Sequence, residues 1–326
     1  MGVRIDAWLF ACLPILWFQF FPCPASAEAL DNLLQKDKDK RYEYIDWNSV
    51  SGLVKVPLFF ATNRITTRDP FDSAAGELMF GEKCVVVPLR TSKEPFEKLG
   101  WEVQEIDHLS KDDLLQKCRE SKEASLTQNQ FRKALQKAVA SDRDQRVVVF
   151  VHGFNNSFED ALNGGAELSY WYKHPVVVFS WPSAKYTSDA KSAYLNAEKL
   201  VDDSADAFIK LITEISEVPG ITPKNVTIVA HSMGNHILQD LLKKYKTSTE
   251  QRQNPFRELV FCSADLDGAD FANDVQKFLK FGNKVRIFFN ANDGALYLSA
   301  IVHHGKPRLG AVGAHIEKIA NLPETN

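Results

Sequence analysis

The chain has 326 residues, of which 44% are hydrophobic and 25% charged, so it contains enough apolar sequence to bury a large core. Its formal net charge is -3, and basic and acidic residues are interspersed. No basic stripe is available to follow a phosphate backbone, which argues against nucleic acid as a partner and favours a small-molecule or protein substrate.

Residues 1–27 have the layout of a cleavable secretory signal. Arg4 precedes an apolar stretch over residues 7–21, and Ala25-Ser26-Ala27 forms a small-residue cleavage site. An uncleaved membrane anchor is the alternative, but the stretch is shorter than the roughly 20 residues that span a bilayer. We therefore expect cleavage, no stable membrane span afterwards, and export to the periplasm or the exterior.

Residues 28–50 are charged and polar, and we interpret them as an exposed lead-in to a domain that covers residues 51–326. The domain opens with two β-like runs, residues 54–60 and 83–89, which we expect to be antiparallel. Between them lies a turn-rich stretch that includes Ala75-Gly76. Apolar residues at helical spacing then follow at positions 131, 135 and 139.

From residue 146 onward, apolar strands alternate with helical segments. The predicted strands cover residues 146–151, 176–179, 226–230, 258–262 and 284–289, and the predicted helices cover residues 158–172, 190–215 and 235–245. Strands that are apolar on both faces and linked by helices predict an α/β fold with a mostly parallel central sheet and helices on both faces.

The pattern Ala-His-Ser-Met-Gly at residues 230–234 lies between a predicted strand and a predicted helix. This is the setting of a nucleophile elbow, with alanine in place of the first glycine of G-x-S-x-G. In such a turn the Ser232 hydroxyl projects above the sheet, and the backbone N–H of Met233 faces the position of an oxyanion. A helix-capping serine is the structural alternative, which the flanking elements disfavour.

A second motif, His-Gly-Phe-Asn-Asn at residues 152–156, directly follows a predicted strand. A loop of this kind can donate a second backbone N–H to the same oxyanion, and we assign this donor to Phe154. Because His152 stands at the strand end and early in the chain, we interpret it as a structural residue that holds the loop.

The acid and the base of a catalytic triad should follow later strands. Asp293 comes after the last predicted strand and is the preferred acid, with Asp265, after the preceding strand, as the alternative. Three histidines follow Asp293, and no further predicted strand precedes any of them. Among these, His315 is the candidate base, and His303 and His304, which could fold back, are the alternatives. No cysteine or histidine pair has zinc-ligand spacing, and no G-x-G-x-x-G opens a helix, so we expect no metal and no cofactor.

Six sequence pieces together resemble an uncharacterised, mostly bacterial α/β-hydrolase family. They are residues 59–64, 80–81, 151–155, 179–183, 230–235 and 292–296, followed by Ser299 and Arg308. The resemblance implies an α/β-hydrolase fold with Ser232 as nucleophile and Asp293 as acid. It also implies a further strand and a histidine segment beyond residues 308–310, and we expect both to be missing from this chain.

These observations support two functional hypotheses. The first is a serine esterase that transfers an acyl group to water and acts on a small ester or acyl substrate. The second is an exported binding protein, or a truncated inactive fragment, that keeps the fold and the pocket but lacks the catalytic histidine.

Overall fold

A computed structural model describes residues 2–6, 52–65, 74–89, 102–104, 123–183, 190–244 and 256–311. Its strands are β1 (Gly2–Asp6), β2 (Gly52–Arg64), β3 (Ala75–Leu89), β4 (Glu102–Gln104), β5 (Glu123–Leu126), β6 (Val147–Val151), β7 (Val176–Ser180), β8 (Val226–His231), β9 (Glu258–Cys262) and β10 (Lys284–Phe288). In the described ranges they form one ten-stranded sheet in the order β1-β10-β9-β8-β6-β7-β2-β3-β5, with β4 paired to β2. The predicted α/β fold with a mostly parallel sheet is confirmed.

Strands β2, β7, β6, β8, β9 and β10 form the parallel part of the sheet. Every residue of β6 and β7 is buried, as expected for strands covered by helices on both faces. In the register, Val151 at the end of β6 lies opposite Phe179 of β7 and Ala230 of β8. The segments that follow these three strands therefore leave the same edge of the sheet.

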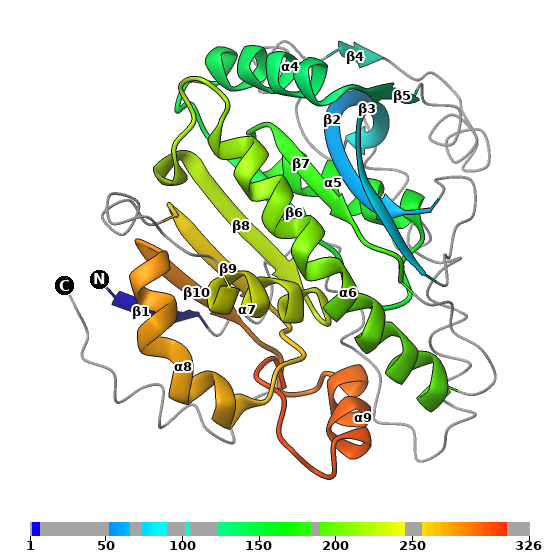
Figure 1. Ribbon diagram of the computed structural model, residues 1–326, viewed down its shortest axis with the longest axis vertical. Helices are drawn as coiled ribbons and strands as arrows, with labels where there is room; N and C mark the ends of the chain where they lie inside the picture. Colours follow the sequence, from blue (N-terminus) through cyan, green and yellow to red (C-terminus); the bar gives the residue numbers. More distant parts are fainter. Residues whose placement is uncertain are drawn as a thin grey trace.

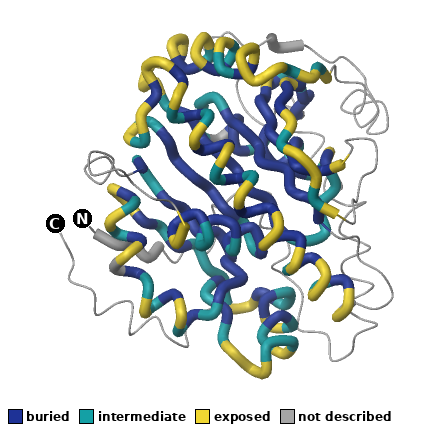
Figure 2. Tube along the Cα trace, viewed as in Figure 1, coloured by how far each residue is buried: buried dark blue, intermediate teal, exposed yellow. Residues whose placement is uncertain are grey.

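The helices are α4 (Gln128–Ser141), α5 (Phe158–Tyr172), α6 (Ala190–Ser216), α7 (Gly234–Lys244), α8 (Gly268–Phe281) and α9 (Gly294–Val302), with a short 3-10 helix, η3 (Pro223–Asn225). Residues of α4, α6, α7 and α8 share one buried cluster with the sheet, and residues of α5 share a second cluster. Figure 1 shows the corresponding arrangement, with α6 and α7 in front of the sheet and α5 behind it. The chain traces in dark blue in Figure 2 show that the central strands are the most buried part.

The predicted helical stripe at residues 131, 135 and 139 is confirmed, because these are the buried positions of α4. Thr127 caps this helix: its side chain accepts a hydrogen bond from the Gln130 N–H, and the Gln130 side chain accepts one from the Thr127 N–H. This reciprocal arrangement satisfies two N–H groups that have no partner inside the helix.

The antiparallel edge of the sheet is longer than the sequence predicted. β2 and β3 pair over most of their length, and β5 pairs antiparallel with β3. Ala75 and Gly76, predicted to lie in a turn, instead begin β3, where Ala75 pairs with Arg64. The start of this strand was not predicted, because the polar residues at this end of the hairpin do not alternate regularly with apolar ones, and such alternation is the usual signal of a strand.

At the opposite edge, β1 pairs in parallel with β10. The remaining residues of the predicted signal segment, 7–27, and the predicted lead-in, 28–50, lie outside the described residues. Cleavage and export therefore stay predictions. None of the helices in the described ranges is long and apolar enough to cross a membrane.

Helix α8 was not identified from the sequence, although its pattern is regular. Asp267 caps it by accepting from the N–H groups of Ala269 and Asp270, and Phe271, Val275 and Phe278 are buried at helical spacing.

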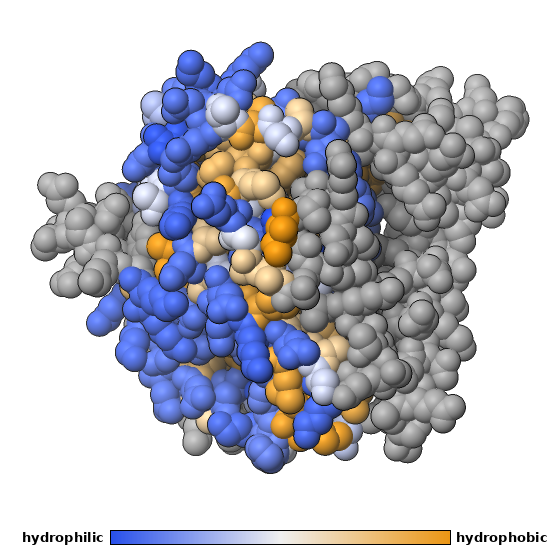
Figure 3. All heavy atoms as spheres, turned by 45° about the vertical axis from the view of Figure 1, so that its right-hand side comes forward, coloured by the Kyte–Doolittle hydropathy of each residue, from blue (hydrophilic) through white to orange (hydrophobic). Residues whose placement is uncertain are grey.

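Helix α9 is apolar on its exposed side as well. Tyr297 and Ile301, one helical turn apart, are each more than half exposed. In the face shown in Figure 3, hydrophobic residues run down the middle of the view, beside a mostly hydrophilic surface.

Candidate active site

Ser232 occupies the turn between β8 and α7, which begins two residues later at Gly234. Its φ of 48° lies in the left-handed region, which few residues other than glycine adopt. The predicted strand and helix on either side of the serine are therefore present. The turn between them has the strained backbone that a nucleophile elbow requires.

Hydrogen bonds with β9, with the segment that follows it and with α7 hold this turn. The Ser232 N–H donates to the Cys262 carbonyl at 2.9 Å, and the Asp265 N–H donates to the Ser232 carbonyl at 3.2 Å. The buried Asn235 side chain donates from Nδ2 to the carbonyls of Ala230 and Ser232, at 3.1 and 2.9 Å. The strain at Ser232 is thus offset by contacts with the end of β9 and the start of α7.

The loop after β6 lies directly against the serine. A Cβ atom built on Gly153 would be 2.9 Å from the Cβ of Ser232, and one built on Gly234 would be 2.3 Å from the carbonyl oxygen of His152. Side chains essentially never approach so closely. Both glycines are therefore required by the contact between this loop and the serine turn.

Phe154 and Met233, the predicted oxyanion donors, are the residues that follow Gly153 and Ser232. Among the described residues, neither backbone N–H donates a hydrogen bond. The Met233 side chain is buried, and the Phe154 ring meets the Tyr194 ring edge-on at a centroid distance of 5.8 Å. The structure brings the two predicted donor segments together beside Ser232.

Asp293, the preferred acid, lies at the start of α9 after the end of β10. Its Oδ1 accepts from the N–H groups of Ala295 and Leu296, at 3.1 and 3.0 Å, and its side chain has a hydrogen bond with Ser263. Ser263 directly follows the residue that holds the Ser232 N–H. Burial, with a contribution from the charge of Asp265, raises the pKa of Asp293 to about 6 despite these hydrogen bonds.

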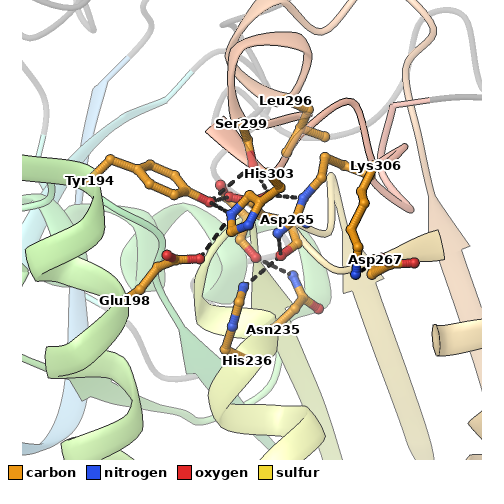
Figure 4. A network of polar contacts seen from close by, with 12 residues as sticks. Tyr194, Glu198, Asn235, His236, Asp265, Asp267, Leu296, Ser299, His303 and Lys306 are labelled. Carbon is orange, nitrogen blue, oxygen red and sulfur yellow. Dashed lines mark hydrogen bonds and ion pairs between the residues drawn. The ribbon is translucent and has the colours of Figure 1, made fainter. Parts of the chain in front are cut away.

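Asp265, the alternative acid, is the centre of a buried polar network (Figure 4). Its Oδ1 accepts from Arg308 Nε and Ser299 Oγ, both at 2.6 Å, and its Oδ2 accepts from the Tyr194 hydroxyl at 2.5 Å. Burial alone would raise the pKa of Asp265, but the Arg308 guanidinium holds it below the ordinary value. Because both oxygens already have partners, Asp265 is less suited than Asp293 to orient a catalytic histidine.

The sequence model of a family described as alpha/beta hydrolases of unknown function (DUF900) matches residues 127–322, more than half of the chain. The chain belongs to this family. The match contains both motifs of the site, at residues 152–156 and 230–234, and both candidate acids. No curated protein matches the sequence.

The base of this α/β hydrolase was predicted to be His315, which lies within the family match but outside the described residues. No strand follows β10 up to Ala311, where the described part ends. The expected lack of a last strand and of a histidine loop stays a prediction.

Two histidines in the described part of the chain lie near Asp265. His236 Nε2 is 2.6 Å from the Asp265 carbonyl oxygen, so this nitrogen carries the proton. His303 Nε2 is 3.0 Å from Glu198 Oε1 and 3.3 Å from the Tyr194 hydroxyl. Burial, supported by the charge of Asp265, raises the pKa of Glu198 to about 7. These contacts engage both imidazoles in the network of Figure 4.

Sequence reasoning missed the contacts of several buried polar side chains. Arg64 is completely buried at the end of β2, where a charged residue signals the end of an apolar run. Tyr194 gave no signal, because its partner Asp265 is 71 residues away in the sequence. In the described ranges, no group of three or more His, Cys, Asp or Glu side chains is placed to hold a metal ion.

Proposed function

We propose that this chain is a serine hydrolase that cleaves a small ester or acyl substrate by acyl transfer to water. Ser232 is the nucleophile, Asp293 the acid and His315 the base, and the N–H groups of Phe154 and Met233 form the oxyanion hole. The observation that carries the proposal is the left-handed φ of 48° at Ser232, in a strand-turn-helix setting with Gly153 packed on the serine.

The steps follow from the chemistry of these groups. The base takes the Ser232 hydroxyl proton as the oxygen attacks the substrate carbonyl, and the two N–H groups stabilise the negative oxygen. The protonated base then gives its proton to the leaving alcohol. Water, activated by the same base, then attacks the acyl group on Ser232, which releases the carboxylic acid product and regenerates the serine. Ionised Asp293 stabilises the imidazolium, so its raised pKa predicts loss of activity as the pH falls below about 6.

Chain connectivity supports His315 as the base. Gly310 packs on the segment after β9: its N–H donates to the Ala264 carbonyl at 2.8 Å, and its own carbonyl accepts from the Asn290 N–H at 3.0 Å. His315 follows this contact by five residues in the sequence, so the proposal places the base on the segment that comes directly after it.

The test is the intact mass of the full chain after reaction with a fluorophosphonate, which phosphonylates an activated serine with loss of fluoride. We expect a single adduct that is absent in Ser232→Ala. The same labelling on His315→Ala and on His303→Ala assigns the base, since only loss of the base should slow phosphonylation, by about 10³-fold or more.

The absence of an adduct on the unaltered chain would refute the serine-hydrolase proposal and favour a binding protein. Rapid labelling of His315→Ala, with loss of labelling in His303→Ala, would keep the hydrolase and replace its base. Protein that reacts with the fluorophosphonate is then assayed with p-nitrophenyl esters of increasing acyl-chain length, which gives the acyl specificity.

We also propose that the protein is exported after cleavage at Ala27, to the periplasm or the exterior. The support is the sequence of residues 1–27. Amino-terminal sequencing of protein from fractionated cells tests this: a mature protein that begins at Glu28 outside the cytoplasm is the expected result.

A further inference from the structure

His152, at the end of β6, is fixed from two sides. Only 1% of it is exposed, and its ring stacks on the Trp181 ring with a centroid distance of 5.2 Å and an angle of 4°. Trp181 Nε1–H donates to the His152 carbonyl at 2.8 Å. Neither the ring nor the backbone of this histidine is free to turn.

The neighbours of His152 define its tautomer. Nδ1 lies 2.8 Å from the carbonyl oxygen of Gly153, which only accepts, so Nδ1 carries the proton. Nε2 faces Arg64 Nη2 at 3.5 Å, and a guanidinium only donates, so Nε2 carries a lone pair. Burial and the charge of Arg64 lower the pKa of His152 to about 3, which keeps the ring neutral.

This tautomer sets the direction of one peptide group. The Gly153 carbonyl accepts from His152 Nδ1 and, at 3.3 Å, from Asn156 Nδ2. In a planar trans peptide the N–H points opposite to the carbonyl, and the described chain contains no cis peptide bond. The Phe154 N–H therefore points away from His152 and Asn156, on a loop whose Gly153 touches Ser232.

Arg64 completes the arrangement from β2. Its Nε donates to Ser180 Oγ at 2.8 Å, and its Nη2 donates to the Asn156 carbonyl at 2.9 Å. A glutamine or a water at this place could accept a hydrogen bond from an Nε2–H of His152, whereas arginine cannot. A buried guanidinium thus excludes the tautomer that would leave the Gly153 carbonyl without its donor.

We infer that His152 and Arg64 are positioning residues, which together orient the Gly153–Phe154 peptide so that the Phe154 N–H is aimed at the oxyanion. The inference rests on the proposed serine-hydrolase function and deepens it. Neither side chain touches the substrate, and neither exchanges a proton during the reaction.

The test compares His152→Leu, which removes the donor to Gly153, with His152→Asn, whose amide can replace Nδ1–H. For His152→Leu we expect kcat on a p-nitrophenyl ester to fall about 100-fold, the loss typical of one oxyanion donor, with KM changed less than about threefold. The affinity for a trifluoromethyl ketone, which forms a tetrahedral oxyanion on the serine, should fall in parallel. His152→Asn should keep most of the kcat and of the inhibitor affinity that His152→Leu loses. Arg64→Met should lower both as His152→Leu does.

His174→Leu is the control, because His174 is a partly buried histidine that is hydrogen-bonded to Asp142 and lies outside the site. It should lose stability without loss of kcat. If His152→Leu fails to fold, Asn156→Ala, which removes the second donor to Gly153, gives the same comparison with a smaller expected loss.

Two results would overturn the inference in distinguishable ways. Unchanged kcat and inhibitor affinity in folded His152→Leu, with the unaltered chain fully labelled by fluorophosphonate, would refute the positioning role alone. An unaltered chain that forms no Ser232 adduct would refute the hydrolase function and the oxyanion role with it.

Discussion

Substitution of Gly234 by alanine should damage the site far more than its single methyl group suggests. The new Cβ would lie 2.3 Å from the carbonyl oxygen of His152, and 3.0 Å is the lower limit for such contacts. The loop after β6 and the start of α7 must therefore separate by at least 0.7 Å. Overpacking of this kind costs about 1–3 kcal/mol of stability.

In the proposed hydrolase, the same displacement acts on catalysis. It moves the loop of Gly153 and Phe154 relative to Ser232, and a misplacement of about 1 Å can reduce the rate about 100-fold, or about 2.7 kcal/mol. The second-order rate of fluorophosphonate labelling measures this loss, and urea unfolding measures the stability. Gly76→Ala is the control, since its Cβ would have no neighbour closer than 3.5 Å. Gly234→Ala with a labelling rate within threefold of the unaltered chain would refute the reasoning.

Three further predictions concern stability. Arg308→Met leaves the Asp265 carboxylate buried without its ion partner and should lower the free energy of unfolding in urea by about 3–5 kcal/mol. Lys277→Ala, which removes an exposed ion pair, should change the free energy of unfolding by less than about 1 kcal/mol. Equal effects of the two substitutions would contradict this prediction. Phe131→Ala should lower the free energy of unfolding by about 3–5 kcal/mol, because the ring is fully buried. A loss below about 1 kcal/mol would contradict this, because it would mean that neighbouring side chains fill the cavity left by the ring. Folding lowers the pKa of His152, so the unfolded chain binds a proton at this residue at a higher pH than the folded chain does. The free energy of unfolding should therefore fall as the pH drops from about 6.5 toward 3, by up to about 1.4 kcal/mol per pH unit. His152→Asn should show a weaker dependence on pH, and an identical dependence would refute the buried neutral state of His152.

The parts of the fold that the sequence predicted are those whose signals are local. Each parallel strand from β6 to β10 is a short apolar run bounded by polar residues, and its predicted range differs from the observed strand by one residue or less at each end, whereas β2 begins two residues earlier and ends four residues later than predicted. The turn at Ser232 was predictable for the same reason, since strand, small residues and helix follow one another directly. Helix α8 carried an equally local signal that was overlooked.

The polar network around Asp265 and the contacts of His152 and Arg64 were not predictable from residue patterns. Tyr194, Asp265 and Arg308 come from three separate elements, and their contact depends on the packing of α6 and of the segment after α9 on the sheet edge. Arg64 and His152 are likewise 88 residues apart. A single sequence contains no periodicity that links such positions, so the hydrogen-bond partners of Asp265 and Asp293 were not predictable from it.

The hydrogen bond from the Ser232 N–H to the Cys262 carbonyl also bears on synthesis of the chain on the ribosome. When the residues of β8 have emerged, β6 and β8 can already pair, but the acceptor that holds the serine turn is made about 30 residues later. Arg308, the partner of Asp265, follows later still. A nascent chain would therefore acquire most of its sheet before the turn at Ser232 is held in place, which delays this geometry until the residues up to Arg308 have been made.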